Sequence, residues 1–112
     1  SPQMNLFQCK IENGLAKISD MQINLNNSLN IQNACIGFRP DDILISDQGE
    51  YSSSANLVEY LGSDMIIYSS VGGQEFSCKL SSKINLKAGD NFKFNISPSV
   101  LHIFDNTSGQ RV

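Results

Sequence analysis

Apolar and polar residues alternate along much of this chain, in short runs that turn residues separate. In the run MQINL at 21–25, three apolar side chains alternate with Gln22 and Asn24. An alternation with a period of two is typical of a β-strand with one buried face. Further runs of strand-forming residues occupy 7–12, 15–18, 34–38, 43–45, 58–80, 92–96 and 101–104. The sequence therefore predicts strands along most of its length.

Turn signals divide these runs. Asn13-Gly14 lies between two of them and is a strong hairpin signal, because both residues can adopt a positive φ. The turns LGSD and VGGQ divide 58–80 into a three-stranded meander, and Gly62 is expected to supply a positive φ in the first of them. A single helical turn is expected at 98–100. Turn signals about every 8 to 12 residues favour a small barrel over a parallel sheet.

Length and composition narrow the picture further. A chain of 112 residues makes one compact domain, or two small barrels that share a core. Its hydrophobic share of 40%, charged share of 17% and net charge of -3 describe an ordinary composition with a weak acidic bias. The eight Lys and Arg residues are scattered singly from Lys10 to Arg111. Nucleic acid is not expected as a partner, because phosphate binding requires clustered cations.

The sequence predicts neither a targeting segment nor a disulfide framework. No apolar run approaches the roughly 20 residues of a membrane span, and SPQMNLFQCK lacks the basic and apolar regions of a signal peptide. Cys9, Cys35 and Cys78 are odd in number and form no CxxC, so neither a disulfide framework nor a zinc site is indicated. They are expected to be buried or half-buried thiols in a cytosolic chain.

No motif predicts catalysis, a metal site or a cofactor site. Gly72-Gly73 lies between two strands, and GxxxxGK[ST] is absent, so the pair is interpreted as a hairpin turn. His102 is the only histidine and is interpreted as a strand residue, because no nucleophile accompanies it in a recognisable setting. The adjacent Asp41 and Asp42 are expected to cap a turn. The chain is therefore not expected to be an enzyme.

Four separated segments occur together in one order: SPQMN, IGFRPDDI, VEYLGSDMIIYSSVGGQEFSCKL and AGDNFKFNISPSVLHIFDNTSGQRV. In this order and spacing they resemble the C-terminal regulatory region of the ATP-binding subunits of maltose-type (MalK-like) sugar ABC importers. The resemblance covers nearly the whole chain. That family places an SPxMN segment just after the last helix of its nucleotide-binding domain, so this chain resembles a tail without its ATPase half.

The resemblance implies an all-β fold of OB-fold-like (TOBE) small β-barrels, with two subbarrels that share a core. About ten strands exceed the five of a single OB barrel. Within one domain, 1–112, the first subbarrel is assigned to about 1–33 plus 97–112 and the second to about 34–96. The polar loops 24–33 and 46–56 match nothing firmly in the family.

The resemblance also implies a role. The chain would be a non-catalytic regulatory and dimerisation domain, in which two copies meet and tether their ATPase halves while those halves open and close. The implied partners are a second copy of the tail, the ATPase half, the membrane subunits and a possible regulatory protein. ATP and Mg are expected in the ATPase half and no cofactor in this chain. The implied location is cytoplasmic, peripheral at the inner face of the membrane, and the solute remains open among sugar, sugar alcohol and glycerol phosphate.

The resemblance implies that two short motifs contribute to the interface. The family signature G-[IF]-R-P-[ED] matches Gly37, Phe38, Arg39, Pro40 and Asp41. A planar guanidinium can bridge a carboxylate and carbonyls together, so Arg39 is expected either to tie the tails or to brace its own turn. The VE.LG turn of the family matches Glu59, Leu61 and Gly62.

Two other classes of function stay open. An OB module that binds an oxyanion of the molybdate or sulfate type would use the hydroxyls of Ser52, Ser53 and Ser54, but no supporting Lys is recognised beside them. An OB domain that binds single-stranded nucleic acid would stack bases on an aromatic platform, which lacks a basic groove here. The aromatic side chains considered for it are Tyr51, Tyr60, Tyr68 and Phe76. Packing in a core or an interface is the favoured interpretation for them.

Overall fold

The computed structural model describes residues 3–112, whose regular structure is β-strand apart from two short 3-10 turns. The strands are β1 (Asn5–Glu12), β2 (Leu15–Ile18), β3 (Met21–Asn24), β4 (Ile31–Phe38), β5 (Ile43–Ile45), β6 (Tyr51–Ser54), β7 (Leu57–Leu61), β8 (Asp64–Val71), β9 (Gln74–Leu80), β10 (Asn91–Ile96), β11 (His102–Asp105) and β12 (Gln110–Arg111). The 3-10 turns are η1 (Pro40–Asp42) and η2 (Pro98–Val100). The predicted all-β class is confirmed. Ser1 and Pro2 of the SPQMN segment lie outside the described residues.

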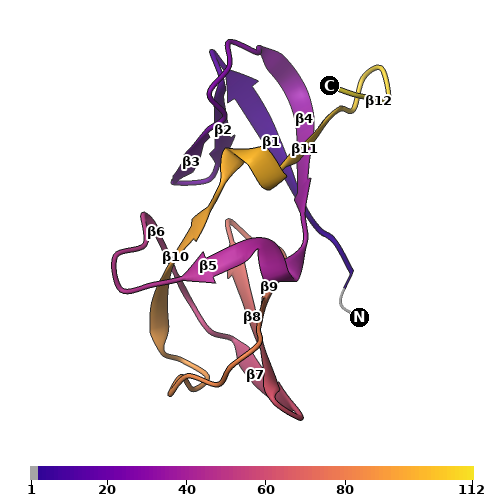
Figure 1. Cartoon of the computed structure of the whole chain (residues 1–112). Coiled ribbons are helices and arrows are strands. Elements are labelled where there is room, and N and C mark those ends of the chain that lie inside the picture. Colours follow the sequence, from indigo (N-terminus) through magenta and orange to yellow (C-terminus); the bar gives the residue numbers. More distant parts are fainter. Residues whose placement is uncertain (1–2) are drawn as a thin grey trace.

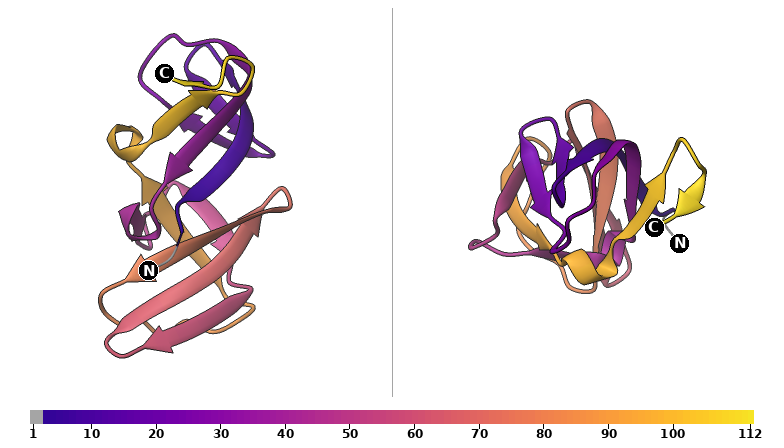
Figure 2. Two further views of the ribbon diagram at one scale, coloured as in Figure 1. Left: turned by 90° about the vertical axis from the view of Figure 1, so that its right-hand side faces the viewer. Right: turned by 90° about the horizontal axis from the view of Figure 1, so that it is seen from above.

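The strands form three antiparallel sheets. A six-stranded sheet has the order β12-β11-β4-β1-β2-β3, and two three-stranded sheets have the orders β5-β10-β6 and β7-β8-β9. The six-stranded sheet forms one end of the molecule and the two smaller sheets form the other (Figure 1). The molecule is elongated, with extents of 40 × 26 × 23 Å, as the two further views show (Figure 2). This arrangement is consistent with an OB-like small β domain.

The position of β4 differs from the sequence-based boundary between subbarrels. Residues 34–38 were assigned to the second subbarrel, but β4 runs on to Phe38 as a strand of the six-stranded sheet, paired with both β1 and β11. The apolar run ACIGF keeps this pairing until Pro40, which has no N–H to donate. The chain therefore leaves the six-stranded sheet at η1. The division into two subbarrels stays a prediction, with its boundary moved from 33/34 to η1.

The turn chemistry follows the sequence. Asn13 and Gly14 have φ values of 49° and 77° at the β1–β2 hairpin, and Gly62 has a φ of 61° between β7 and β8. A residue with a Cβ is strained in this left-handed region, which explains the glycines. The predicted helical turn at 98–100 is η2.

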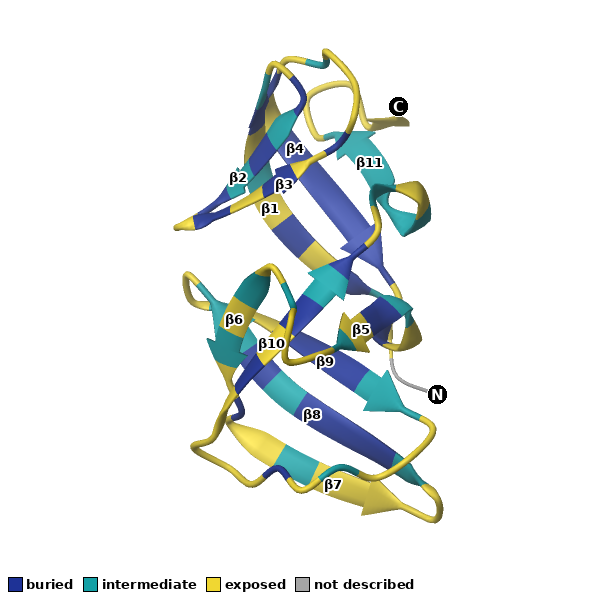
Figure 3. Ribbon diagram, turned by 60° about the vertical axis from the view of Figure 1, so that its left-hand side comes forward, coloured by how far each residue is buried: buried dark blue, intermediate teal, exposed yellow. Residues whose placement is uncertain are grey.

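One hydrophobic core joins the three sheets. Its buried cluster includes side chains from each of them. A row of rings crosses it: Phe38 and Phe7 of the six-stranded sheet lie 5.4 Å apart between centroids, Phe7 and Phe76 of β9 lie 5.5 Å apart, and Phe76 and Phe94 of β10 lie 5.5 Å apart. Pairs at this spacing contribute beyond the area they bury. The expectation of a shared core is confirmed, and the burial map shows it as dark bands facing one another (Figure 3).

The three cysteines are thiols, half-buried at Cys9 and buried at Cys35 and Cys78, as the sequence predicts. Burial raises the pKa of Cys78 to about 12, and burial together with the nearby Cys35 raises the pKa of Cys9 to about 11. A group whose pKa is higher in the folded state than in the unfolded state stabilises the fold below the unfolded pKa. That contribution is lost as the pH rises through the folded pKa.

We therefore expect the free energy of unfolding to fall as the pH rises from about 9 towards 12, because the unfolded thiols ionise first. Urea unfolding at a series of pH values measures this loss. The matched variant Cys78→Ala should be less stable at neutral pH, yet its stability should depend less steeply on pH. An equal slope in the variant and the parent would contradict the assignment to Cys78.

Candidate interface and polar groove

The GFRPDD motif forms the corner where β4 ends and η1 begins. The Arg39 N–H donates to Oδ2 of Asp42 at 3.0 Å, and the Asp42 N–H donates to the Arg39 carbonyl at 3.0 Å. Pro40 occupies the first turn of η1, where its missing N–H costs nothing. Phe38 and Pro40 are buried, whereas Arg39 and Asp41 are exposed. The corner is therefore capped by Asp42, as expected for this acidic pair.

The Arg39 side chain does not brace this corner through a carboxylate. Ion pairs among residues 3–112 join Glu12 to Lys10 and Lys17, and Asp64 to Lys79. Arg39 has no such partner within this part of the chain. Its guanidinium and the Asp41 carboxylate thus project from a corner that is held by other groups.

The VE.LG motif lies on a different surface. Glu59 and Leu61 belong to β7, the edge strand of the β7-β8-β9 sheet, and Gly62 forms the following hairpin. The η1 corner packs against β9, so β8 and β9 separate the two motifs. A hydrogen bond with Glu59 raises the pKa of the Tyr68 phenol. The structure does not bring the two predicted groups together, and an interface role for either stays a prediction.

A contact that the sequence analysis missed joins β1 to β9; we call residues 5–8 and 74–77 the seam. The buried Asn5 side chain donates from Nδ2 to the Ser77 carbonyl at 2.9 Å and accepts the Ser77 N–H on Oδ1 at 2.9 Å. In the opposite direction, Gln74 accepts the Gln8 N–H on Oε1 at 2.7 Å and donates to the Gln8 carbonyl at 2.8 Å. Each amide side chain therefore pairs with a strand edge as a neighbouring backbone would.

A close approach of two turns supports the seam. Gly72, between β8 and β9, has a φ of 56°, and a Cβ placed on it would lie 2.7 Å from the Cβ of Ser19, between β2 and β3. Only glycine fits this contact without a shift of the backbone. The β8–β9 hairpin thus contacts the six-stranded sheet at its turn as well as at the seam.

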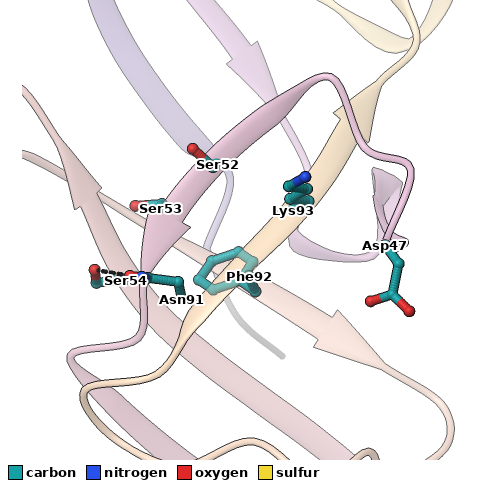
Figure 4. Close-up of a pocket in the computed structure, with 7 residues that line it drawn as sticks. All are labelled: Asp47, Ser52, Ser53, Ser54, Asn91, Phe92 and Lys93. Atoms are coloured by element: carbon teal, nitrogen blue, oxygen red, sulfur yellow. Dashed lines mark hydrogen bonds between the residues drawn. The ribbon is translucent and has the colours of Figure 1, made fainter.

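A polar groove of about 720 Å³ lies over β6 and β10. It is lined by Asp47, Ser52, Ser53, Ser54, Asn91, Phe92 and Lys93 (Figure 4). The expectation that no Lys accompanies the serines is wrong, because strand pairing sets Lys93 opposite Ser52. This partnership depends on the register of β10 against β6, which the sequence does not reveal.

Two of the three serine hydroxyls in this groove are already bonded. The Ser53 hydroxyl lies 2.6 Å from the Ser69 hydroxyl, and the Ser54 hydroxyl donates to Asn91 at 2.7 Å. Asp47 adds a carboxylate to the same groove. A single Lys beside an acidic group is a weak anion site, because a bound oxyanion would face repulsion from the carboxylate. The geometry therefore does not favour the oxyanion alternative.

The aromatic side chains considered for base stacking do not share a surface. Phe76 is buried in the core, and Tyr51 packs on Phe94 with ring centroids 5.7 Å apart. Tyr60 is exposed, with the Lys83 ammonium 5.3 Å from its ring centroid. The predicted preference for packing over stacking is consistent with these positions.

Residues 3–112 also lack two other features. No group of three or more His, Cys, Asp or Glu side chains in this range is arranged to hold a metal ion. No helix described here has the length and hydrophobicity of a membrane span.

Comparisons with known proteins show what the chain is similar to. No family model matches the chain. It is 28% identical to the oligosaccharides import ATP-binding protein MsmX of Bacillus subtilis, over 100% of this chain and 35% of that protein. The sn-glycerol-3-phosphate import ATP-binding protein UgpC 2 of Agrobacterium fabrum is 29% identical over 100% of this chain and 32% of its own length. The chain is homologous to part of these importer subunits.

A shorter match agrees with these two. UgpC of Cupriavidus pinatubonensis is 36% identical over 81 residues, which cover 70% of this chain and 22% of that protein. The chain thus spans about a third of the length of the relatives that it matches in full. This extent is consistent with the C-terminal part of an importer ATP-binding subunit, and the resemblance predicted from the four motifs is confirmed.

Proposed function

We propose that this chain is the non-catalytic regulatory and dimerisation domain of the ATP-binding subunit of a carbohydrate-type ABC importer. The observation that carries the proposal is the match of its whole length to about a third of MsmX and UgpC 2. In the intact subunit, the remaining two thirds would bind ATP and Mg and would contact the membrane subunits at the cytoplasmic face. The tail would hold two such subunits together.

The solute would be selected elsewhere in the transporter. MsmX is named for oligosaccharides and UgpC 2 for glycerol 3-phosphate, yet this chain is about equally similar to both. A region that is shared across importers of such different solutes supports a role in assembly and regulation. We propose a solute of the sugar or glycerol-phosphate class.

The seam and the shared core would let the domain act as a rigid tether. A tether must keep its two ends in fixed relation while the attached ATPase halves move. The paired amides of Asn5 and Gln74, together with the row of rings, make the sheets one body in which a displacement at one end moves the other. The regulatory contact is proposed to involve the exposed groups of the η1 corner, Arg39 and Asp41.

The expected self-association of the isolated tail is weak. The exposed large apolar side chains on the described surface are Leu6, Leu44, Leu57, Tyr60, Leu61 and Val112. Half of them lie on the single short strand β7, so no broad apolar face is left for a second copy. Interfaces of about 1,000 Å² or less tend to be transient. Attachment to dimerising ATPase halves would raise the local tail concentration to roughly millimolar and would stabilise such a contact.

Arg39→Glu should weaken the self-association of the chain by about tenfold or more, because it reverses the charge opposite the partner tail. Sedimentation equilibrium at several protein concentrations measures the dimer constant. Arg111→Glu on β12 makes the same charge change away from the η1 corner and should leave the constant unchanged. Equal dimer constants in Arg39→Glu and the parent, or a tight dimer at nanomolar protein, would count against this role.

A further inference from the structure

An open groove of about 550 Å³ lies where the N-terminal segment meets the β7-β8-β9 sheet. Gln3, Met4 and Asn5 form one side of it, and Leu57, Tyr68 and Ser77 belong to the other. We call this the outer groove, because Leu57, Tyr68 and Ser77 lie on the sheet face that points away from the core, although Phe76 of the core cluster also lines it. The described chain begins at its rim with Gln3.

Residue alternation identifies this face. Met65 and Ile67 of β8 belong to the core cluster, whereas Ile66, between them, is buried outside that cluster. Strand pairing sets Leu57 opposite Tyr68 and Glu59 opposite Ile66, so these four side chains lie on the same outer face. Leu57 is 52% exposed there. β7 is an edge strand with one unpaired side, and proteins usually cover an exposed leucine on such a strand.

The remainder of the subunit can supply that cover. The relatives that match the chain in full are about three times as long, and the match is consistent with their C-terminal part. The segment that joins the ATPase half to this chain would therefore emerge at the rim of the outer groove. Asn5 fixes the start of β1, because two hydrogen bonds to the Ser77 backbone hold β1 against β9 at this point.

On the basis of the proposed function, we infer that the outer groove docks the segment that immediately precedes residue 1 in the longer subunit. The segment covers Leu57 and Tyr68 with apolar side chains. Glu75 lines the groove and Glu59 lies beside Tyr68, and neither forms an ion pair with a described residue. A Lys or Arg in the docked segment would complement this acidic rim. Because the segment is covalently tethered, a modest apolar contact is sufficient.

Thiol labelling of the full-length subunit tests this inference. Leu57→Cys places a thiol in the groove, and Leu44→Cys places one on β5, where the native leucine is 62% exposed. In residues 1–112 alone, both thiols would react with a maleimide reagent at similar rates. We expect the Leu57→Cys subunit to react at least about tenfold more slowly than the Leu44→Cys subunit. The subunit without either substitution gives the background from the native cysteines.

The possible results distinguish docking in the outer groove from dimerisation of the subunit. Equal labelling rates at the two positions would overturn the docking. Protection of Leu57→Cys that disappears on dilution would assign the cover to a second copy and would also overturn it. Sedimentation of the same samples reports the oligomeric state: a dimer with a fast-reacting Leu57→Cys refutes only the groove, and a monomer with a slow-reacting one refutes only the dimerisation role. Hydrogen exchange at 56–58, at the start of the edge strand β7, should be slower in the unsubstituted subunit than in residues 1–112 alone, and equal exchange would contradict the docking without any substitution.

Discussion

Phe76→Ala should lower the free energy of unfolding by about 3–5 kcal/mol, the usual cost of removing a buried phenylalanine. Phe76 is 3% exposed and packs between Phe7 of the six-stranded sheet and Phe94 of the β5-β10-β6 sheet. Its loss leaves a cavity at the point where the three sheets meet. Urea unfolding followed by circular dichroism measures the change.

A matched exposed aromatic provides the control for Phe76→Ala. Tyr60 is 53% exposed, so Tyr60→Ala should cost about 0.5 kcal/mol or less. Because the core is shared, the parent chain should unfold in one transition, and circular dichroism and tyrosine fluorescence should give the same midpoint. A cost for Phe76→Ala close to that of Tyr60→Ala, or two separate transitions in the parent, would show that the sheets do not depend on one another.

Asn5→Ala should be the next most destabilising change, although Asn5 is a polar residue. The side chain is 6% exposed and satisfies both the N–H and the carbonyl of Ser77. A buried backbone group that is left without a partner costs about 1–3 kcal/mol. Thermal or urea unfolding measures the loss, and Gln3→Ala, at an exposed position nearby, should be nearly neutral.

Asn5→Asp separates the seam bonds from simple packing. A carboxylate can accept the Ser77 N–H but cannot donate to the Ser77 carbonyl, whereas a protonated carboxyl group can do both. Burial raises the pKa of such a carboxyl group, so the variant should be closest to the parent at low pH and should lose stability as the pH rises through that pKa. An Asn5→Asp variant that loses stability equally at pH 4 and pH 7 would show that the seam hydrogen bonds do not stabilise the fold. An Asn5→Ala variant as stable as Gln3→Ala would show the same.

Local chemistry explains which parts of the fold the sequence could predict. The Asn13-Gly14 hairpin, the turn at Gly62 and the corner at Pro40 each depend on a residue whose own backbone preference decides the local structure. The pattern of apolar runs likewise predicted the all-β class. Residues 34–38 were assigned to the second subbarrel, although they pair with β1 and β11, because ACIGF has the same local pattern whichever strands flank it.

Contacts between distant segments could not be predicted from the sequence pattern. Asn5 and Ser77 are 72 positions apart, and Gln8 and Gln74 are 66 apart, so nothing near either amide indicates its partner. Lys93 reaches the serine groove only through the register of β10 against β6. Even so, the four motifs in their order predicted the resemblance to importer ATP-binding subunits, because a resemblance over the whole chain includes such distant constraints without revealing them.

We have proposed that this chain holds two importer ATPase subunits together. Sedimentation of the full-length subunit without nucleotide, with and without residues 1–112, tests it most directly. We expect a dimer for the intact subunit and a monomer for the truncated one, with the truncated subunit dimerising only when ATP is added. A truncated subunit that forms an equally tight dimer without nucleotide would show that residues 1–112 do not hold the two subunits together.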